Sequence, residues 1–423
     1  MNWLKRWRGE KMGKPKIRFK GYTEDWEQRK LGELYQRNTE RNENLIGYDK
    51  TISVATMSYK DDGNGASESS LSTYKVLRVG DIAFEGHTNK QFRFGRFVVN
   101  DIGTGIMSPR FSTLRPLNEM PVNFWKQYIH SESVMRRILV NSTKAGTMMN
   151  ELVIPEFLNQ TIMVPSENEQ AVIGQYFTNL DHIITLHQRK CDEAKKLKKC
   201  MLQKMFPKDG EKVPEIRFSG FTSDWKQRKL NEVCKINGRI GFRGYTQKDI
   251  VSQEQGGVLT FSPTNIVDNT LTMKCRNTYI TKEKYEESPE IKIKNGDILF
   301  VKTGSTLGKS ALVMGLHENA TINPQIVVLR TQEEEAKFLS VILISDSLLK
   351  KVAAVKIGGA VPTITEAELK NFTFYEPEDF AERVKIGNCF TYFDSIITFH
   401  QQKCDELKNI KRFMLQNIFV SEK

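Results

Sequence analysis

The chain is an internal duplication, and this repeat constrains its fold more than any other feature. Residues 17–34 read IRFKGYTEDWEQRKLGEL and residues 216–233 read IRFSGFTSDWKQRKLNEV, with 12 of the 18 positions identical. Residues 169–207 and 382–420 form a second matching pair, with 21 of 39 positions identical. Repeats of this length indicate copies of one structural unit. The sequence therefore predicts two halves of roughly 200 residues built on one scaffold.

The segments between these matching blocks differ between the halves. Residues 35–168 and 234–381 share only short traces, such as VGDIAF against NGDILF and SPRFSTLR against NPQIVVLR. Runs rich in β-branched and aromatic residues, separated by Gly, Asn, Asp and Pro, predict mixed β structure with some helix. One scaffold with two different middles indicates two different recognition surfaces.

The second matching block predicts a long helix in each half. Its inward-facing positions recur at alternating steps of four and three, which is the a/d seam of a coiled coil. Because both copies carry this seam, we expect the two helices to pack on each other, although a helix packed on its own domain is an alternative. The predicted seam residues are Ile173, Phe177, Leu180, Ile184, His187, Cys191, Ile386, Phe390, Phe393, Ile397, His400 and Cys404.

The composition favours a polyanionic partner. The formal net charge is +12 and the pI is about 9.2, which is typical of proteins that bind nucleic acid. The six cysteines include no C-x-x-C pair, so we expect a reducing compartment and no zinc site. No apolar run is long enough for a membrane span, and the basic N-terminus lacks the apolar stretch of a secretory signal. Residues 1–11 can be read as an extension ahead of an alternative start at Met12.

One stretch, KNGDILFVKTGSTLGKSALV at residues 294–313, resembles a phosphate-binding loop but departs from it. That loop needs four residues between its first glycine and the Gly-Lys pair, then a helix, whereas Gly304 and Gly308 enclose three residues. The first half has no Gly-Lys-Ser at this place. The sequence also lacks an Asn/Asp-Pro-Pro-aromatic methyltransferase tetrapeptide, and no catalytic or metal-ligand spacing recurs in both halves. These patterns favour a binding protein over an enzyme.

Together, the repeated blocks resemble the specificity subunit of Type I restriction–modification systems over nearly the whole chain. The resemblance rests on the doubled IRF-x-G-[FY]-T-x-D-W-x-Q-R-K-L-x-E block, the doubled IIT-x-HQ-x-KCDE helix and the doubled M-L-Q-x-[MI]-F ending. It implies an α+β fold: two tandem mixed α/β target-recognition domains separated by two long antiparallel helices, with a pseudo-twofold axis from the duplication. The domain limits that we predict are 1–15 for an N-terminal extension, 16–170 for target-recognition domain 1, 171–207 for a central spacer helix, 208–215 for a linker, 216–382 for target-recognition domain 2 and 383–423 for a C-terminal spacer helix.

The resemblance also implies a function. Such a subunit is not an enzyme on its own. It reads an asymmetric bipartite site in double-stranded DNA and recruits two modification subunits, which methylate adenine N6, and two restriction subunits, which translocate and cut DNA. The chain itself is expected to bind no cofactor, with S-adenosylmethionine, ATP and Mg on the partners, and to act in the bacterial cytoplasm on DNA. A helix over residues 171–206 would span about 54 Å, more than one DNA turn of roughly 34 Å, so an unread gap between half-sites is expected.

The candidate DNA-contacting residues lie in polar, glycine-punctuated segments of the two middles. Arg and Lys can pair with guanine O6 and N7, and Asn and Gln with adenine N6 and N7, while most cations in such loops meet phosphates. An alternative function remains open from the residues, namely a helical adaptor whose duplicated domains bind a non-DNA ligand. The candidates are Asn89, Lys90, Gln91, Arg93, Arg96, Arg110, Arg239, Arg243, Tyr245, Lys302, Thr303, Ser305, Thr306 and Lys309.

Overall fold

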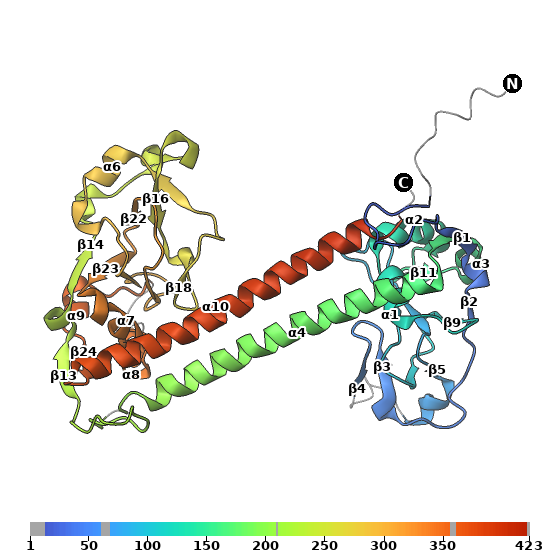
Figure 1. Cartoon of the computed structure of the whole chain (residues 1–423), viewed down its shortest axis with the longest axis horizontal. Coiled ribbons are helices and arrows are strands. Elements are labelled where there is room, and N and C mark those ends of the chain that lie inside the picture. The colour runs from blue at the N-terminus through green and yellow to red at the C-terminus, as the bar shows by residue number, and fades with distance from the viewer. Residues whose placement is uncertain (1–12, 61–67, 209, 356–360, 421–423) are drawn as a thin grey trace. The chain divides into compact units, whose positions relative to one another are not determined.

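The computed structural model describes residues 13–60, 68–208, 210–355 and 361–420. These residues form two compact units, which Figure 1 colours along the chain. Unit 1 contains the chain up to His187 together with the segment from Gln402 onward, and unit 2 contains Gln188–Gln401. Each long helix contributes to both units. The domain limits predicted from the sequence remain a proposal.

The described part of unit 1 contains two four-stranded sheets and two strand pairs. The strands are β1 (Glu27–Lys30), β2 (Tyr35–Arg37), β3 (Thr51–Ser53), β4 (Ser58–Lys60), β5 (Lys75–Leu77), β6 (Ile82–Glu85), β7 (Arg96–Val99), β8 (Gly105–Met107), β9 (Thr113–Pro116), β10 (Thr143–Lys144), β11 (Glu151–Leu152) and β12 (Thr161–Val164). One sheet has the order β2-β9-β6-β7 and is antiparallel. The other has the order β4-β3-β8-β5, with β3 and β8 parallel. The pairs are β1–β12 and β10–β11.

The described part of unit 2 repeats this plan. Its strands are β13 (Lys226–Lys229), β14 (Lys235–Gly238), β15 (Ile250–Val251), β16 (Val258–Phe261), β17 (Ile266–Val267), β18 (Thr270–Leu271), β19 (Thr278–Ile280), β20 (Ile298–Val301), β21 (Ser310–Leu312), β22 (Ala320–Ile322), β23 (Ile326–Arg330) and β24 (Thr373–Glu376). The sheet β14-β23-β20-β21 matches the order β2-β9-β6-β7 of unit 1. The second sheet is β15-β19-β16-β22, with β16 and β22 parallel, and the pairs are β13–β24 and β17–β18.

The repeated Gly-Asp-Ile-x-Phe trace is the inner strand of the first sheet in each unit. Successive side chains of a strand point to opposite faces, and β20 uses both faces. Ile298 and Phe300 enter one hydrophobic core of unit 2, whereas Leu299 and Val301 enter another. All four are buried. The trace is retained in both halves because this strand joins two cores.

The helices cover the sheets and extend from them (Figure 1). They are α1 (Val122–Tyr128), α2 (Glu132–Ser142), α3 (Ile154–Asn159), α4 (Glu167–Lys204), α5 (Leu230–Val233), α6 (Lys282–Glu286), α7 (Glu333–Ile342), α8 (Asp346–Val355), α9 (Glu366–Lys370) and α10 (Phe380–Asn417). The long helices α4 and α10 have 38 residues each and lie where the repeated block predicts them.

The seam residues nearest the domains belong to the domain cores. Ile173 and Phe177 of α4 lie in the main core of unit 1. Ile386 and Phe390 of α10 lie in the main core of unit 2, and Phe393 packs against it. The alternative of a helix packed on its own domain therefore describes these parts of the seam.

Beyond those residues the two helices contact each other. In unit 2 the Cys191 thiol lies 3.8 Å from the carbonyl oxygen of Ile397. In unit 1 the Cys404 thiol lies 3.6 Å from the carbonyl oxygen of Ile184. The same contact thus occurs in each unit with the two helices exchanging roles, as a duplicated seam requires.

Two equivalent ion pairs flank these contacts. Lys198 Nζ lies 2.5 Å from Asp394 Oδ1 in unit 2, and Lys411 Nζ lies 2.7 Å from Asp181 Oδ1 in unit 1. Residues later in α4 meet residues earlier in α10, so the helices run antiparallel. Burial raises the pKa of Asp394, while Lys198 opposes this shift. The remaining seam residues are buried or half-buried: Leu180, His187 and His400.

The first repeated block closes each unit onto the end of a long helix. The amide of Ile17 donates to the carbonyl of Asn417 at 3.0 Å in unit 1, and the amide of Ile216 donates to the carbonyl of Lys204 at 2.8 Å in unit 2. The next residue in each block is an arginine that forms a two-pronged ion pair with a buried glutamate near the start of a long helix. The pairs are Arg18–Glu169 and Arg217–Glu382.

Candidate nucleic-acid interface

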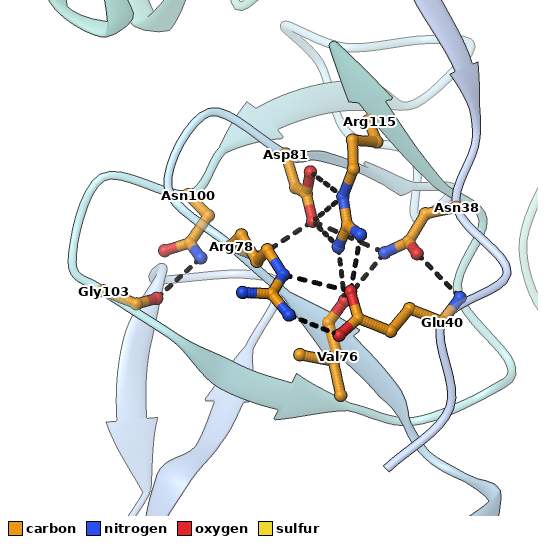
Figure 2. A network of polar contacts seen from close by, with 8 residues as sticks. All are labelled: Asn38, Glu40, Val76, Arg78, Asp81, Asn100, Gly103 and Arg115. Atoms are coloured by element: carbon orange, nitrogen blue, oxygen red, sulfur yellow. Dashed lines mark hydrogen bonds and ion pairs between the residues drawn. The ribbon is translucent and has the colours of Figure 1, made fainter. Parts of the chain in front are cut away.

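A buried aspartate paired with a half-buried arginine joins two strands of the first sheet in unit 1. Asp81, which is 1% exposed, accepts hydrogen bonds from Arg115 Nε at 3.0 Å and Arg115 Nη2 at 2.8 Å. Asp81 also accepts from the amide of Arg78, and Arg115 donates to the carbonyl of Val76, as Figure 2 shows. The hydrogen bond to Asp81 is the largest of the influences that raise the pKa of Arg115. We call this pair the latch of unit 1, because it ties the segment from Val76 to Asp81 to strand β9.

Unit 2 has the same latch. Arg330 donates from Nε and Nη2 to the two carboxylate oxygens of Asp297, both at 2.7 Å, and Asp297 is fully buried. The amide of Lys294 donates to Asp297, and Arg330 donates to the carbonyl of Lys292. The two traces that the halves share, Gly-Asp-Ile and Leu-Arg, therefore hold the two partners of one structural contact. Sequence comparison found both traces but did not pair them.

The surroundings of the two latches differ at one position, just after the first strand of the sheet. In unit 1, Glu40 binds Arg78 at 2.7 Å and Arg115 at 2.5 Å, and the hydrogen bond from Arg78 is the largest of the influences that lower its pKa (Figure 2). The register places Arg239 at the equivalent position of unit 2, since Gln36 faces Arg115 and Lys235 faces Arg330. The same scaffold position thus carries opposite charges in the two units.

Arg239 is turned inward. The residue is 6% exposed, and its guanidinium donates to the carbonyl of Ile322 and the hydroxyl of Thr321, both at 3.1 Å. Its carbon Cζ lies 5.5 Å from the centre of the Tyr245 ring, and burial lowers the pKa of Arg239. Arg243 is half-buried and lies 3.5 Å from Glu290. These three candidates shape the segment after β14, and their contact with DNA stays a prediction.

The segment between β6 and β7 forms a polar loop in unit 1, which we call reading loop 1 (residues 86–95). Asn89 Oδ1 accepts from the amides of Gln91 and Phe92, so Asn89 fixes the loop, and the Phe92 ring is buried beneath it. Arg96 at its base binds Glu85 at 2.5 Å. Candidates that remain exposed in or near this loop are Asn89, Lys90, Gln91, Arg93 and Arg110.

Reading loop 2 (residues 302–310) lies between β20 and β21. The amide of Gly308 donates to Val301 at 2.9 Å, and the amide of Lys309 donates to Thr306 at 3.1 Å. Amides that bond to the chain's own carbonyls are not arranged to cradle a phosphate, and β21 follows where a phosphate-binding loop would begin a helix. Lys302 is half-buried against Glu366 at 3.4 Å. The other candidates are exposed at Ser305 and Lys309 and half-buried at Thr303 and Thr306.

A second loop meets each reading loop. In unit 1 the amide of Asn150 donates to the carbonyl of Gly86 at 3.0 Å. A Cβ atom at Gly86 would lie 1.9 Å from the Asn150 carbonyl oxygen, so only glycine allows this approach. In unit 2 the amide of Gly304 donates to Pro362 at 3.0 Å, and the amide of Ile364 donates to Lys302 at 2.8 Å. Sequence analysis did not identify these second loops, because the contacts join segments about 60 residues apart.

The described residues carry no sign of a resident metal or of a membrane segment. Within them, no group of three or more His, Cys, Asp or Glu side chains could hold a metal ion. No described helix combines the length and the apolar character that crossing a bilayer requires.

The comparisons with known proteins point to one family. The family model described as "Type I restriction modification DNA specificity domain" matches residues 23–196 and 222–409. The chain is 21% identical over 418 residues to the Type I restriction enzyme MjaVIII specificity subunit of Methanocaldococcus jannaschii, which covers 95% of this chain and 93% of that protein. It is also 23% identical over 234 residues to the putative MjaX specificity subunit of the same organism, which covers 49% of this chain and 52% of that protein.

Solved structures agree at the level of the fold. The Type-I restriction-modification system S subunit from M. genitalium is similar with a TM-score of 0.63 and 13% identity, covering 97% of this chain and all of that one. A chain in a study of the assembly and conformational transition of the type I R-M system is similar with a TM-score of 0.50 and 17% identity, covering 92% of this chain and 96% of that one. The predicted architecture, two α/β domains with two long helices packed together, is confirmed.

Proposed function

Since this chain belongs to the family of DNA specificity subunits of Type I restriction–modification systems, we propose that its two units read different half-sites of one asymmetric DNA target. The observation that carries this proposal is the latch. Both units fix the strand that leads into the reading loop, β6 or β20, by the same Asp–Arg contact at the opposite end of that strand, whereas the residues of the reading loops differ. The same structural contact combined with different loops suits two units that recognise different DNA sequences.

The exposed side chains of the reading loops are the proposed DNA contacts. In unit 1 these are Lys90, Gln91 and Arg93, and in unit 2 they are Ser305 and Lys309. Amide and guanidinium groups can read base edges in the major groove, and the remaining cations neutralise phosphates. Arg96, Arg239 and Lys302 are proposed to shape the loops instead, because their charged groups are already bonded within the chain.

The catalytic steps belong to other subunits in this proposal. The chain is the specificity subunit of a Type I complex and not its catalytic part. Two modification subunits that use S-adenosylmethionine would methylate adenine N6, and two restriction subunits that use ATP and Mg would translocate and cleave DNA. The duplicated scaffold supports two copies of each partner, because equivalent surfaces can bind equivalent partners. Such a complex would act on DNA in the bacterial cytoplasm.

Footprinting tests the proposed function. The chain in complex with its modification subunit is expected to protect two separate patches of DNA with an unprotected gap between them. Binding should weaken steeply with salt because many contacts go to phosphates. Absence of protection, or one continuous patch, would overturn the proposal and favour an adaptor that binds another ligand.

Replacing Lys309 by alanine is expected to weaken recognition of only one half-site. Its ammonium group is exposed on reading loop 2, and loss of a base contact costs about 1–3 kcal/mol, while loss of a phosphate contact lowers the salt slope by about 1. Affinities for DNA with changes in one half-site or the other give the measurement. Lys196→Ala in α4 removes the same charge from unit 2 away from the loops and is the matched control. Unchanged affinity and salt slope would remove Lys309 from the interface.

A further inference from the structure

A groove runs between two helices of unit 1, and we call it groove 1. Its volume is about 850 Å³. Leu415 and Gln416, in the last turns of α10, line one side. Glu132, Ser133 and Arg136, in the first turns of α2, line the other. All of these residues lie within unit 1.

Groove 2 occupies the equivalent place in unit 2, with a volume of about 360 Å³. Leu202 and Gln203 of α4 line one side, and they match Leu415 and Gln416 in the repeated helix block. Asp346, Ser347 and Lys350 of α8 line the other side. The two grooves therefore share one equivalent pair of elements, the end of a long helix and the start of a short helix, and within that pair the same classes of side chain.

The short helix of each groove, α2 or α8, lies in the divergent middle of its half, yet its first residues have the same side-chain chemistry in both halves. Residues 131–137 read SESVMRR and residues 345–351 read SDSLLKK, so every position retains its residue class. The reading loops, in contrast, share little. A surface that both halves retain suits a ligand that both halves meet, whereas the half-sites that they read are proposed to differ.

The side chains favour a protein over DNA as that ligand. Each groove carries a carboxylate, Glu132 or Asp346, beside its basic side chains, and such mixed charges suit a protein surface better than a row of phosphates. Each also carries a leucine that is only partly buried against the core and so leaves apolar surface in the groove. Gln91 of reading loop 1 reaches groove 1, but no residue of reading loop 2 lines groove 2. Contact with DNA is therefore not the property that the two grooves share.

The charges around the grooves define the complementary partner. Groove 1 has three arginines against one glutamate, and groove 2 has three lysines against two carboxylates, of which Glu215 lies 2.5 Å from Lys204. An acidic segment with an apolar anchor would match both grooves, because its anchor would cover the leucine while its carboxylates meet the basic rim.

We propose that groove 1 and groove 2 each receive one copy of the modification subunit, through a segment that presents an apolar side chain flanked by acidic residues. This inference rests on the proposed function, because it takes the two identical partners from there. The inference adds where on this chain the two modification subunits bind. Substitutions in one groove should then prevent the binding of one copy without affecting the other.

Bulky substitutions in the grooves test the inference. Ser133 is exposed and Ser347 half-buried, both in the first turn of a helix, so a tryptophan at either position would fill the groove without entering the core. Native mass spectrometry with the purified modification subunit counts the copies bound per chain. Wild type is expected to bind two copies, Ser133→Trp and Ser347→Trp one copy each, and the double variant none. Ser223→Trp, at an exposed position outside both grooves, is the matched control and should bind two.

The outcomes separate the two proposals. Two copies on the double variant would overturn the docking inference and leave the proposed function intact. A double variant that keeps both copies but loses DNA affinity would identify the grooves as phosphate contacts, which also overturns the inference. A wild-type chain that binds no modification subunit would contradict the proposed function itself. Unchanged thermal unfolding of the double variant is required for the expected result to count as support.

Discussion

Arg330→Met is expected to destabilise unit 2 by about 3–5 kcal/mol, because it removes one partner of a buried ion pair and leaves the other charge uncompensated. Asp297 is fully buried, and its carboxylate accepts two bonds from Arg330 at 2.7 Å in addition to the one from the amide of Lys294. Methionine fills much of the space of the arginine stem but cannot donate. Hydrogen exchange should show faster opening of β20 and β23, the strands that the latch joins.

Two further variants make this result specific. Arg115→Met removes the equivalent latch partner in unit 1, so exchange should rise in β6 and β9 while β20 and β23 stay protected. The double variant Asp297→Leu with Arg330→Met removes both charges and should regain most of the lost stability, since apolar replacements of buried pairs are often neutral. Equal stability of Arg330→Met and wild type would show that the latch is not a structural contact.

Gly387→Ala is expected to destabilise unit 2 by about 1–3 kcal/mol, although alanine normally strengthens a helix. Gly387 lies in α10 where the helix meets α7. A Cβ atom there would lie 2.7 Å from the backbone nitrogen of Phe338 and 2.9 Å from the Lys337 side chain, so the two helices would have to separate. Chemical denaturation measures the change in the free energy of unfolding.

The equivalent glycine of unit 1 makes a similar close helix contact, and an exposed glycine provides a control. Gly174 of α4 stands against the backbone nitrogen of Phe124 at the same 2.7 Å, so Gly174→Ala should destabilise unit 1 in the same way. Gly241→Ala, where an added Cβ meets nothing within 4 Å, should leave stability unchanged or slightly raised. A stabilising Gly387→Ala would mean that the helices approach less closely than the structure places them.

The sequence predicted those features of the fold that depend on local periodicity or on a motif repeated in both halves. Heptad spacing predicted α4 and α10, and the repeated Gly-Asp-Ile-x-Phe trace predicted β6 and β20. Pairing between distant segments was not predicted, because nothing in local periodicity joins Asp81 to Arg115 or Gly86 to Asn150. The same reason explains Arg239: the polar segment around it suggested a DNA contact, but hydrogen bonds to Thr321 and Ile322, which are distant in the sequence, hold its guanidinium inward.

For the candidate site, the sequence predicted which residue types occur in which loops, but not which of their side chains are exposed. Polar composition and glycine spacing located both reading loops, yet they did not distinguish an exposed Lys309 from a half-buried Lys302 that lies against Glu366. That distinction depends on whether an acidic partner lies nearby in space. A comparison of the halves offers a better signal, because a charged residue retained in both, such as Arg115 and Arg330, has a structural role.

The backbone hydrogen bonds that close each unit onto a long helix have a consequence for chain connectivity. The amide of Ile216 donates to the carbonyl of Lys204 with only 11 residues between them, and the amide of Ile17 donates in the same way to the carbonyl of Asn417. The identical joint forms whether its two sides are neighbours in the sequence or 400 residues apart. The joint therefore does not depend on a direct chain connection between its two sides. The fold does not require the two halves to be encoded in this order.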